Sequence, residues 1–229
     1  ENSGLIFVAS TDIGGKSEIK PKFRAIKKAG ARCVNVQMLD HDPPTRRAVD
    51  ATRRVMAVAD ELDMDVSIEV HRDTCTETPE KAYALAAGFE RAEKRPLKMT
   101  WDFSHPAVIK HLYPPYWDRL AERPDLIKLA NQIHFRPFNG HHAQIPALGR
   151  DGNHTPEFLD WLTFAEQVLA CWLEAAPPGR ELFVCAEQIP MGYNLSVFPS
   201  LWKDTQAVRA AVDRVWQRQL RKWNRRDSG

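Results

Sequence analysis

Two short stretches, SIEVHR at residues 67–72 and MTWDFSH at residues 99–105, decide the fold class. Each places an acidic residue, Glu69 or Asp102, at or near the end of a short run of strand-forming residues, and these two acids are 33 residues apart. One βα unit of an eight-unit barrel of about 250 residues takes about 31 residues. The interval therefore indicates two successive βα units with their acids at corresponding positions.

The same alternation continues on both sides of these stretches. Short runs rich in β-branched or aromatic residues alternate with longer amphipathic stretches, which is typical of an α/β protein with a parallel sheet. No internal repeat or linker divides the chain, so we expect a single domain over residues 1–229. The expected strands are residues 5–9, 32–37, 65–70, 97–102, 131–135 and 182–187.

The helices carry readable start signals. Thr78 and Thr155 each precede a proline and a glutamate, which places a hydroxyl cap before proline at the first helical position. The last helix is expected over residues 205–220, followed by a frayed, solvated basic tail at residues 221–229. Its predicted buried face consists of Val208, Ala211, Val212 and Val215.

Residues 138–154 form a long loop with two adjacent histidines between an expected strand and an expected helix. Loops of this length inside a compact domain are usually functional lids or disordered segments. Because this loop follows a strand that ends in a candidate functional residue, we expect it to be a lid.

Composition and charge exclude several classes of protein. The 229 residues are 27% charged and 43% hydrophobic, as in a globular protein. A net charge of +2 does not favour nucleic acid as a partner. The most apolar stretch, residues 158–176, contains three acidic residues and does not suit a membrane span. Four scattered cysteines without a C-x-x-C pair, and no secretory signal, lead us to expect a cytoplasmic protein.

Four residues carry the expected chemistry: Glu69, Asp102, His134 and Glu187. The intervals between them are 33, 32 and 53 residues, and the last equals one βα unit plus the long loop. Because the ends of successive parallel strands meet at one rim, these side chains should lie close together. Three carboxylates in one cleft repel unless they take up protons or bind a cation, and oxygen donors with one imidazole suit a divalent metal ion.

At this point the chain resembles a known family. Glu69-x-His71, Asp102-Phe-Ser-His105, His134-x-Arg136 and Ala186-Glu187 look like the metal motifs of the xylose isomerase-like TIM barrels, the sugar phosphate isomerase/epimerase superfamily. The resemblance extends over the chain from Gly4 onward. It implies an α/β fold of the TIM (β/α)8 type and makes Glu69, Asp102, His134 and Glu187 the ligands of one divalent metal, with manganese first and magnesium, cobalt or zinc as alternatives.

In this resemblance the first strand of the chain corresponds to the third strand of the family. Two βα units, roughly 50 residues, would then be lacking at the N-terminus. An open parallel barrel exposes an apolar strand edge. We therefore expect the remaining portion to be disordered, left out or replaced by a partner chain, and a closed six-stranded barrel is the alternative.

The implied function is that of a metal-dependent isomerase or epimerase acting on a sugar or keto-sugar through an enediolate. Glu69 and Glu187 would be the catalytic acid and base. The expected substrate contacts are His71, His105 and Arg136, and the first and last of these share strand parity with Glu69 and His134. Both histidines could equally be buried and bonded to the backbone, and Arg136 could simply neutralise the carboxylates.

Other functions remain open from the sequence. A lyase, dehydratase or deglycosidase acting on keto-sugars or inositol ketones would use the same chemistry, and a non-catalytic carbohydrate-binding barrel would keep the fold. A DNA-repair endonuclease of the endonuclease IV type would need further histidines for three zinc ions, and the VAS and VNVQ segments of the earliest strands offer none. No glycine-rich phosphate cradle is evident, so a free sugar and a phosphorylated one both stay open as substrates. A homo-oligomeric assembly is also left open.

Overall fold

The computed structural model describes residues 4–40, 42–198 and 200–226. The chain divides into two compact units, Glu1–Thr100 and Trp101–Gly229. The division falls inside strand β4 (Met99–Asp102), so Thr100 ends the first unit and Trp101 begins the second. The prediction of a single domain over residues 1–229 stays a prediction.

The strands follow one another in the sheet in chain order, β1-β2-β3-β4-β5-β6. The pairs β1 with β2, β2 with β3, and β5 with β6 are parallel, as the alternating pattern predicts. Five of the six expected strands are confirmed within two residues at each end. They are β2 (Cys33–Met38), β3 (Val66–Val70), β4, β5 (Gln132–His134) and β6 (Phe183–Cys185).

The first strand is a correction. We expected it at residues 5–9, but β1 runs over Val8–Ile13. Its pairing with β2 extends from Val8 beside Cys33 to Ile13 beside Met38. The apolar run that drew the prediction lies mostly before this pairing, and Leu5 and Ile6 are 84% and 62% exposed. Backbone pairing, rather than the hydrophobicity of that run, sets the strand.

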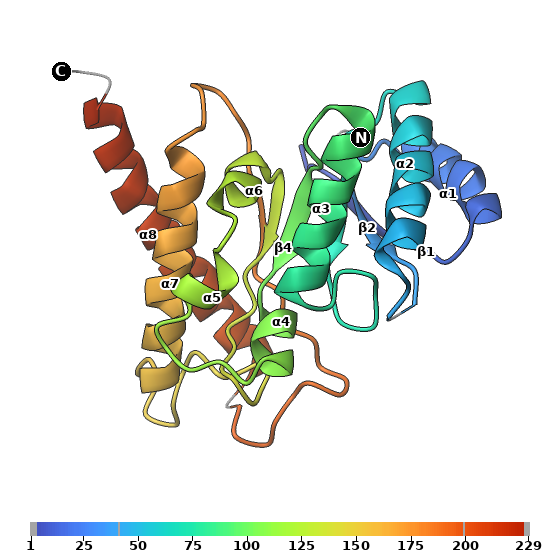
Figure 1. Ribbon diagram of the computed structural model, residues 1–229. Coiled ribbons are helices and arrows are strands. Elements are labelled where there is room, and N and C mark those ends of the chain that lie inside the picture. Colours follow the sequence, from blue (N-terminus) through green and yellow to red (C-terminus); the bar gives the residue numbers. More distant parts are fainter. Residues whose placement is uncertain (1–3, 41, 199, 227–229) are drawn as a thin grey trace. The chain divides into compact units, whose positions relative to one another are not determined.

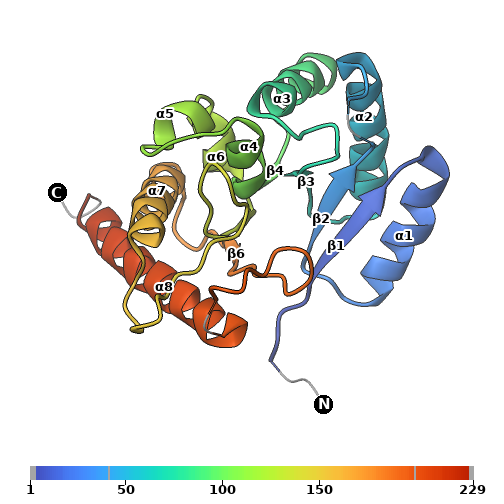
Figure 2. The same ribbon diagram turned by 90° about the horizontal axis from the view of Figure 1, so that it is seen from below.

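In the first unit, three helices lie on one side of the strands (Figures 1 and 2). They are α1 (Lys16–Lys28), α2 (Thr45–Glu61) and α3 (Pro79–Glu93). Strand β3 is buried along its whole length. Helices α2 and α3 pack closely at Gly88, where an added Cβ would lie 2.5 Å from Cγ2 of Val49. Glu69 is the one charged residue of β3.

In the second unit, helices α7 (Pro156–Leu173) and α8 (Leu201–Arg226) lie side by side (Figure 1). The shorter helices are α4 (Ser104–Ile109), α5 (Trp117–Leu120) and α6 (Pro124–Leu129). Aromatic rings fill the core: Trp101 stacks on Phe103 with centroids 5.0 Å apart, and Phe103 meets Phe164 edge-on at 5.0 Å. The rings that flank the candidate ligands are therefore packing residues.

Both predicted helix starts are confirmed. The Thr78 hydroxyl accepts a hydrogen bond from the Lys81 amide, and the Thr155 hydroxyl accepts one from the Phe158 amide. The last helix is longer than expected, because α8 begins at Leu201 and continues to Arg226. Residues 221–226 are thus helical rather than frayed, and residues 227–229 lie outside the described residues. The predicted buried face of α8 is confirmed at Val208, Ala211, Val212 and Val215.

The segment over residues 138–154 has no helix and forms only an isolated bridge between Leu148 and His154. Hydrogen bonds to later parts of the chain hold this segment at two points. The Asp204 carboxylate accepts hydrogen bonds from the amides of Ala147 (3.0 Å) and Leu148 (2.9 Å). The Gln144 side chain exchanges two hydrogen bonds with the backbone of Ile189, at 3.1 and 2.7 Å. The expected long loop is present, and its role as a lid stays a prediction.

None of the helices in the described part of the chain combines the length and the apolar character that crossing a membrane would take.

Candidate metal centre

The four predicted metal ligands all lie at or just beyond the carboxyl ends of strands. Asp102 and His134 are the last residues of β4 and β5, and Glu69 is the residue before the end of β3. Glu187 follows two residues after β6. In a parallel sheet the carboxyl ends of the strands share one edge, which is where α/β proteins place their functional side chains. The regular spacing of these residues along the chain therefore follows the spacing of the strands.

Glu69 is held by two amides on the neighbouring strand. Its side chain is buried, with 1% of the residue exposed. Its Oε2 accepts hydrogen bonds from Nδ2 of Asn35 at 2.6 Å and from Nε2 of Gln37 at 2.9 Å. These two residues of β2 position the carboxylate and are not among the predicted site residues. VNVQ places two amides at alternate positions of an otherwise apolar strand, but nothing in this segment identifies Glu69 as their partner.

Asp102 is fully buried and its two oxygens have different surroundings. Its Oδ1 accepts hydrogen bonds from the amide (2.9 Å) and the hydroxyl (2.6 Å) of Ser104. Its Oδ2 lies 3.3 Å from Nε2 of His105 and 3.4 Å from Nη2 of Arg136, but makes no hydrogen bond within the described residues. Burial alone would raise the pKa of Asp102, but the positive charges of His105 and Arg136 outweigh it and hold the pKa well below its usual range.

Arg136 joins two of the predicted ligands within the second unit. Its Nη2 lies 2.7 Å from Oε1 of Glu187 and 3.4 Å from Oδ2 of Asp102, and the residue is only 2% exposed. Its guanidinium also lies over the Tyr193 ring, 4.9 Å from the centroid. Burial lowers the pKa of Arg136, but the charges of Asp102 and Glu187 outweigh it and leave the pKa above its usual value. Of the two readings of Arg136, the contacts support neutralisation of carboxylates.

His134 has a neighbour at each ring nitrogen. Its Nε2 lies 2.7 Å from Nε2 of Gln132, and its Nδ1 lies 3.0 Å from Oε2 of Glu187. An amide nitrogen can only donate, so Nε2 of His134 is the accepting nitrogen in this arrangement. A cation bound at either nitrogen would replace one of these contacts.

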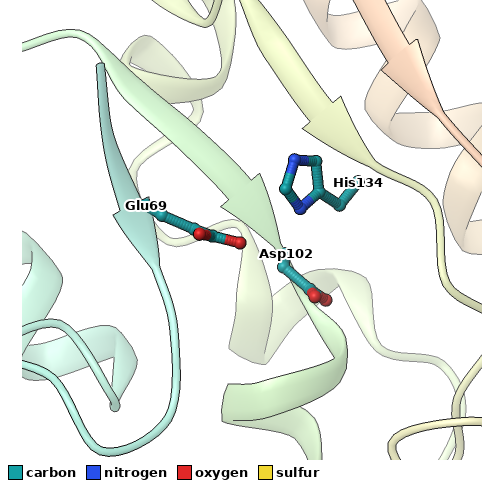
Figure 3. A group of neighbouring side chains, drawn as sticks. All are labelled: Glu69, Asp102 and His134. Atoms are coloured by element: carbon teal, nitrogen blue, oxygen red, sulfur yellow. The ribbon is translucent and has the colours of Figure 1, made fainter. Parts of the chain in front are cut away.

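Glu69, Asp102 and His134 form a group that suits a metal ion (Figure 3). One donor atom from each residue lies within 4.8 Å of the other two. Ligand bonds of about 2.0–2.3 Å to one shared ion separate two donors on opposite sides by up to about 4.6 Å. Glu187 is not in this group, and instead contacts His134 and Arg136.

The other two predicted substrate contacts differ from each other. His105 is buried beside Asp102 and is 2% exposed, so its place is against a ligand. His71 follows β3 and is half-buried, with its Nδ1 2.7 Å from the backbone carbonyl of Arg72. The backbone contact proposed as the alternative for these histidines is thus seen for His71. Their contact with a substrate stays a prediction.

Comparison with known proteins supports the fold. No protein-family model and no curated protein sequence matches the chain. Among solved structures, a xylose isomerase-like TIM barrel protein from Mycobacterium smegmatis, in complex with magnesium, is similar with a TM-score of 0.52 and 15% identity. The match covers 88% of this chain and 67% of that one. The predicted α/β fold of the xylose isomerase-like TIM barrel type is therefore confirmed.

A second solved structure, the thiamine phosphate pyrophosphorylase from Pyrococcus furiosus, matches 92% of this chain and 96% of its own. The identity is 11% and the TM-score is 0.26, which is too low to indicate a shared fold.

Proposed function

We propose that the chain is a divalent-metal-dependent isomerase or epimerase acting on a sugar or keto-sugar through an enediolate. The observation that carries this proposal is the group of Glu69, Asp102 and His134, whose donor atoms lie within 4.8 Å of one another. The magnesium in the similar barrel from Mycobacterium smegmatis supports a divalent ion as the cofactor.

The donor set fits a divalent ion on three counts. Carboxylate and imidazole donors together suit manganese, magnesium, cobalt or zinc. Oδ2 of Asp102 is a buried carboxylate oxygen that lies 3.3 Å from His105 and 3.4 Å from Arg136 but accepts no hydrogen bond in the described residues, so it can still bind a cation. Finally, the three carboxylates of Glu69, Asp102 and Glu187 outnumber the positive charges of Arg136 and His105, so the group keeps a negative charge that favours a cation.

In the proposed site Glu69, Asp102 and His134 would hold the ion, and Glu187 would complete the set if its carboxylate turned from His134. When bound, a divalent cation polarises the substrate carbonyl and stabilises the enediolate. Asn35 and Gln37 keep Glu69 in place by binding one of its two oxygens. Gln132 contacts Nε2 of His134, and the Ser104 amide donates a hydrogen bond to Oδ1 of Asp102, so these two ligands are also held in place.

Proton transfer falls to the two glutamates. Arg136 fixes Oε1 of Glu187 at 2.7 Å, while 23% of the Glu187 side chain remains exposed, so this carboxylate is both oriented and reachable. Glu69 is 1% exposed and belongs to the group of candidate metal ligands. We assign removal of the proton next to the carbonyl to Glu187, and its return to Glu187 or Glu69.

The test is exchange of a substrate C–H proton with deuterated water in the presence of manganese, over a panel of ketoses and keto-sugars. We expect exchange by the native chain, at least about 100-fold slower exchange by Glu187→Gln, and native exchange by Glu90→Gln, an exposed glutamate on α3. Loss of a leaving group instead of exchange would point to the lyase alternative. A sugar that binds without exchanging would contradict catalysis and favour a carbohydrate-binding barrel.

A further inference from the structure

A cavity of about 510 Å³ opens in the first unit between the start of α1 and the first half of α2. Its floor is apolar, with Ile13, Ile19 and Leu39. Its rim carries four basic side chains. They are Lys16, Arg46, Arg47 and Arg54.

The charge of this cavity is unusual for the chain. Asp50 is the one acidic residue in its lining, so four cations and one carboxylate leave a net charge of +3, against +2 for all 229 residues. Other basic residues of this unit are neutralised: Lys22 pairs with Glu18, Arg53 with Glu93 and Arg95 with Asp60. Across residues 4–40, 42–198 and 200–226, no ion pair involves the four rim cations.

We propose that this cavity binds a phosphate monoester group. A phosphate monoester carries close to two negative charges at neutral pH and three acceptor oxygens. Arginine guanidinium groups match such oxygens with two parallel hydrogen bonds, and lysine adds a point charge. Three arginines and one lysine around one cavity supply both kinds of contact, and the apolar floor accommodates the carbon skeleton that bears the phosphate.

The binding site is the basic cavity and not the N-terminus of α1. The Glu18 carboxylate lies beside Gly14: its Oε1 is 3.4 Å from the position that a Cβ on Gly14 would take, and its Oε2 accepts a hydrogen bond from Lys22 at 2.7 Å. The Glu18 side chain therefore occupies the start of the helix. The rim cations on α2 and Lys16 remain available.

The cavity adjoins the candidate metal centre within the first unit. A second cavity, of about 220 Å³, shares Ile13, Gly14 and Leu39 with it and is also lined by Gln37 and His71. Gln37 donates to Glu69. Three aspartates, Asp12, Asp40 and Asp73, line the second cavity, so an anion favours the first.

The separation suits one molecule bound at both places. Asp12 pairs with Gln37 in the sheet, and Val36 pairs with Ile68, so Gln37 lies beside Glu69, which is two strands from Asp12 of β1. Gly14 lies two residues beyond Asp12 along the chain. With strands about 4.8 Å apart and a rise of about 3.3 Å per residue, Gly14 is about 12 Å from Glu69. A phosphorylated five- or six-carbon sugar, met by long arginine side chains, spans such a distance. This step, that the phosphate belongs to the substrate, rests on the proposed function, whereas the phosphate site itself does not.

Calorimetric titration in the presence of EDTA tests the site without any contribution from a metal. The probes are inorganic phosphate, ribulose 5-phosphate and ribulose. We expect both phosphates to bind and ribulose not to bind. Arg46→Gln and Arg47→Gln should each weaken phosphate binding about tenfold, the effect of losing about 1.4 kcal/mol. Arg24→Gln, an exposed arginine of α1 outside the cavity, removes the same charge and should bind as the native chain does.

Tighter binding of ribulose 5-phosphate than of inorganic phosphate supports the site with the substrate's phosphate as its occupant, and equal affinities support it with free phosphate. Absence of phosphate binding, or equal weakening by Arg24→Gln and Arg46→Gln, would overturn the proposal. Thermal unfolding of each variant confirms that these surface substitutions leave the fold intact. Failure of the deuterium exchange with phosphate binding retained would reject the proposed function alone.

Discussion

Nη2 of Arg136 lies 2.7 Å from Oε1 of Glu187, and the same nitrogen lies 3.4 Å from Oδ2 of Asp102. One buried guanidinium therefore stands between two of the carboxylates that the sequence predicts as metal ligands. It supplies one of the positive charges that the cluster needs, and it does so whether or not a metal is bound. The candidate site can thus fold first and bind its ion afterwards.

Replacing Arg136 should destabilise the fold strongly. Arg136→Met removes the guanidinium from Glu187 and from the fully buried Asp102, which keeps His105 as its other charged neighbour. Breaking a buried ion pair from one side costs about 3–5 kcal/mol. Urea unfolding of Arg136→Met should show a loss of this size, and Arg24→Met, an exposed arginine on α1, should show none. A loss below about 1 kcal/mol would mean that Arg136 behaves like a surface residue.

Asp102→Asn should remove metal affinity without unfolding the chain. The asparagine oxygen can still accept from the Ser104 amide, so the local turn survives. The anionic oxygen offered to the cation is lost, and we expect manganese affinity to fall by at least about 100-fold, the upper end of what outer partners of a metal ligand contribute. Titration with manganese measures this. Asp213→Asn, an exposed aspartate of α8, is the matched control and should bind manganese as the native chain does.

The pairing of α7 with α8 should depend on pH through Glu166. A hydrogen bond from Arg218 lowers the Glu166 pKa more than burial raises it. A lowered pKa in the folded chain adds stability above the usual value of 4.5, and this stability is lost as the pH falls through the lowered value. Glu166→Gln should therefore cost about 0.5–1 kcal/mol at pH 7 and less near pH 3.

Thermal unfolding at both pH values measures this difference. Glu90→Gln, on the exposed side of α3, should match the native chain at either pH. An equal loss at pH 7 and pH 3 would show that the charge of Glu166 is not the cause.

Asp204 should hold the long segment of residues 138–154 in place. It is fully buried and accepts hydrogen bonds from the amides of Ala147 and Leu148. In Asp204→Asn the NH2 group of the asparagine faces one of these two backbone amides, so two donors meet without an acceptor, which costs about 1–3 kcal/mol. We expect faster hydrogen exchange at residues 147 and 148, while Asp213→Asn leaves it unchanged. Unaltered exchange in Asp204→Asn would place the fastening of this segment elsewhere.

The sequence predicts residues that recur once per βα unit, because the length of that unit sets their spacing. The acids and the imidazole at the ends of β3, β4 and β5 recur at the length of a βα unit, so their regular spacing could be recognised from the sequence. The caps at Thr78 and Thr155 were visible for a similar reason, since they depend on neighbours within three residues.

Contacts between distant segments left no such signal. The amides of Asn35 and Gln37 act on Glu69 over 34 and 32 residues, and nothing in VNVQ alone names their partner. The start of β1 depends on pairing with β2, and the apolar run before it misled the prediction. The basic cavity combines Lys16 with arginines about 30 residues further on, so a search for a glycine-rich motif does not find it.

Anomalous diffraction at the manganese edge, on crystals grown with manganese, tests the central claim most directly. We predict one strong peak per chain, with one donor atom each of Glu69, Asp102 and His134 about 2.0–2.3 Å from it. A map with no peak at these residues, or with donors too far apart to share an ion, would contradict the metal centre and the catalysis built on it.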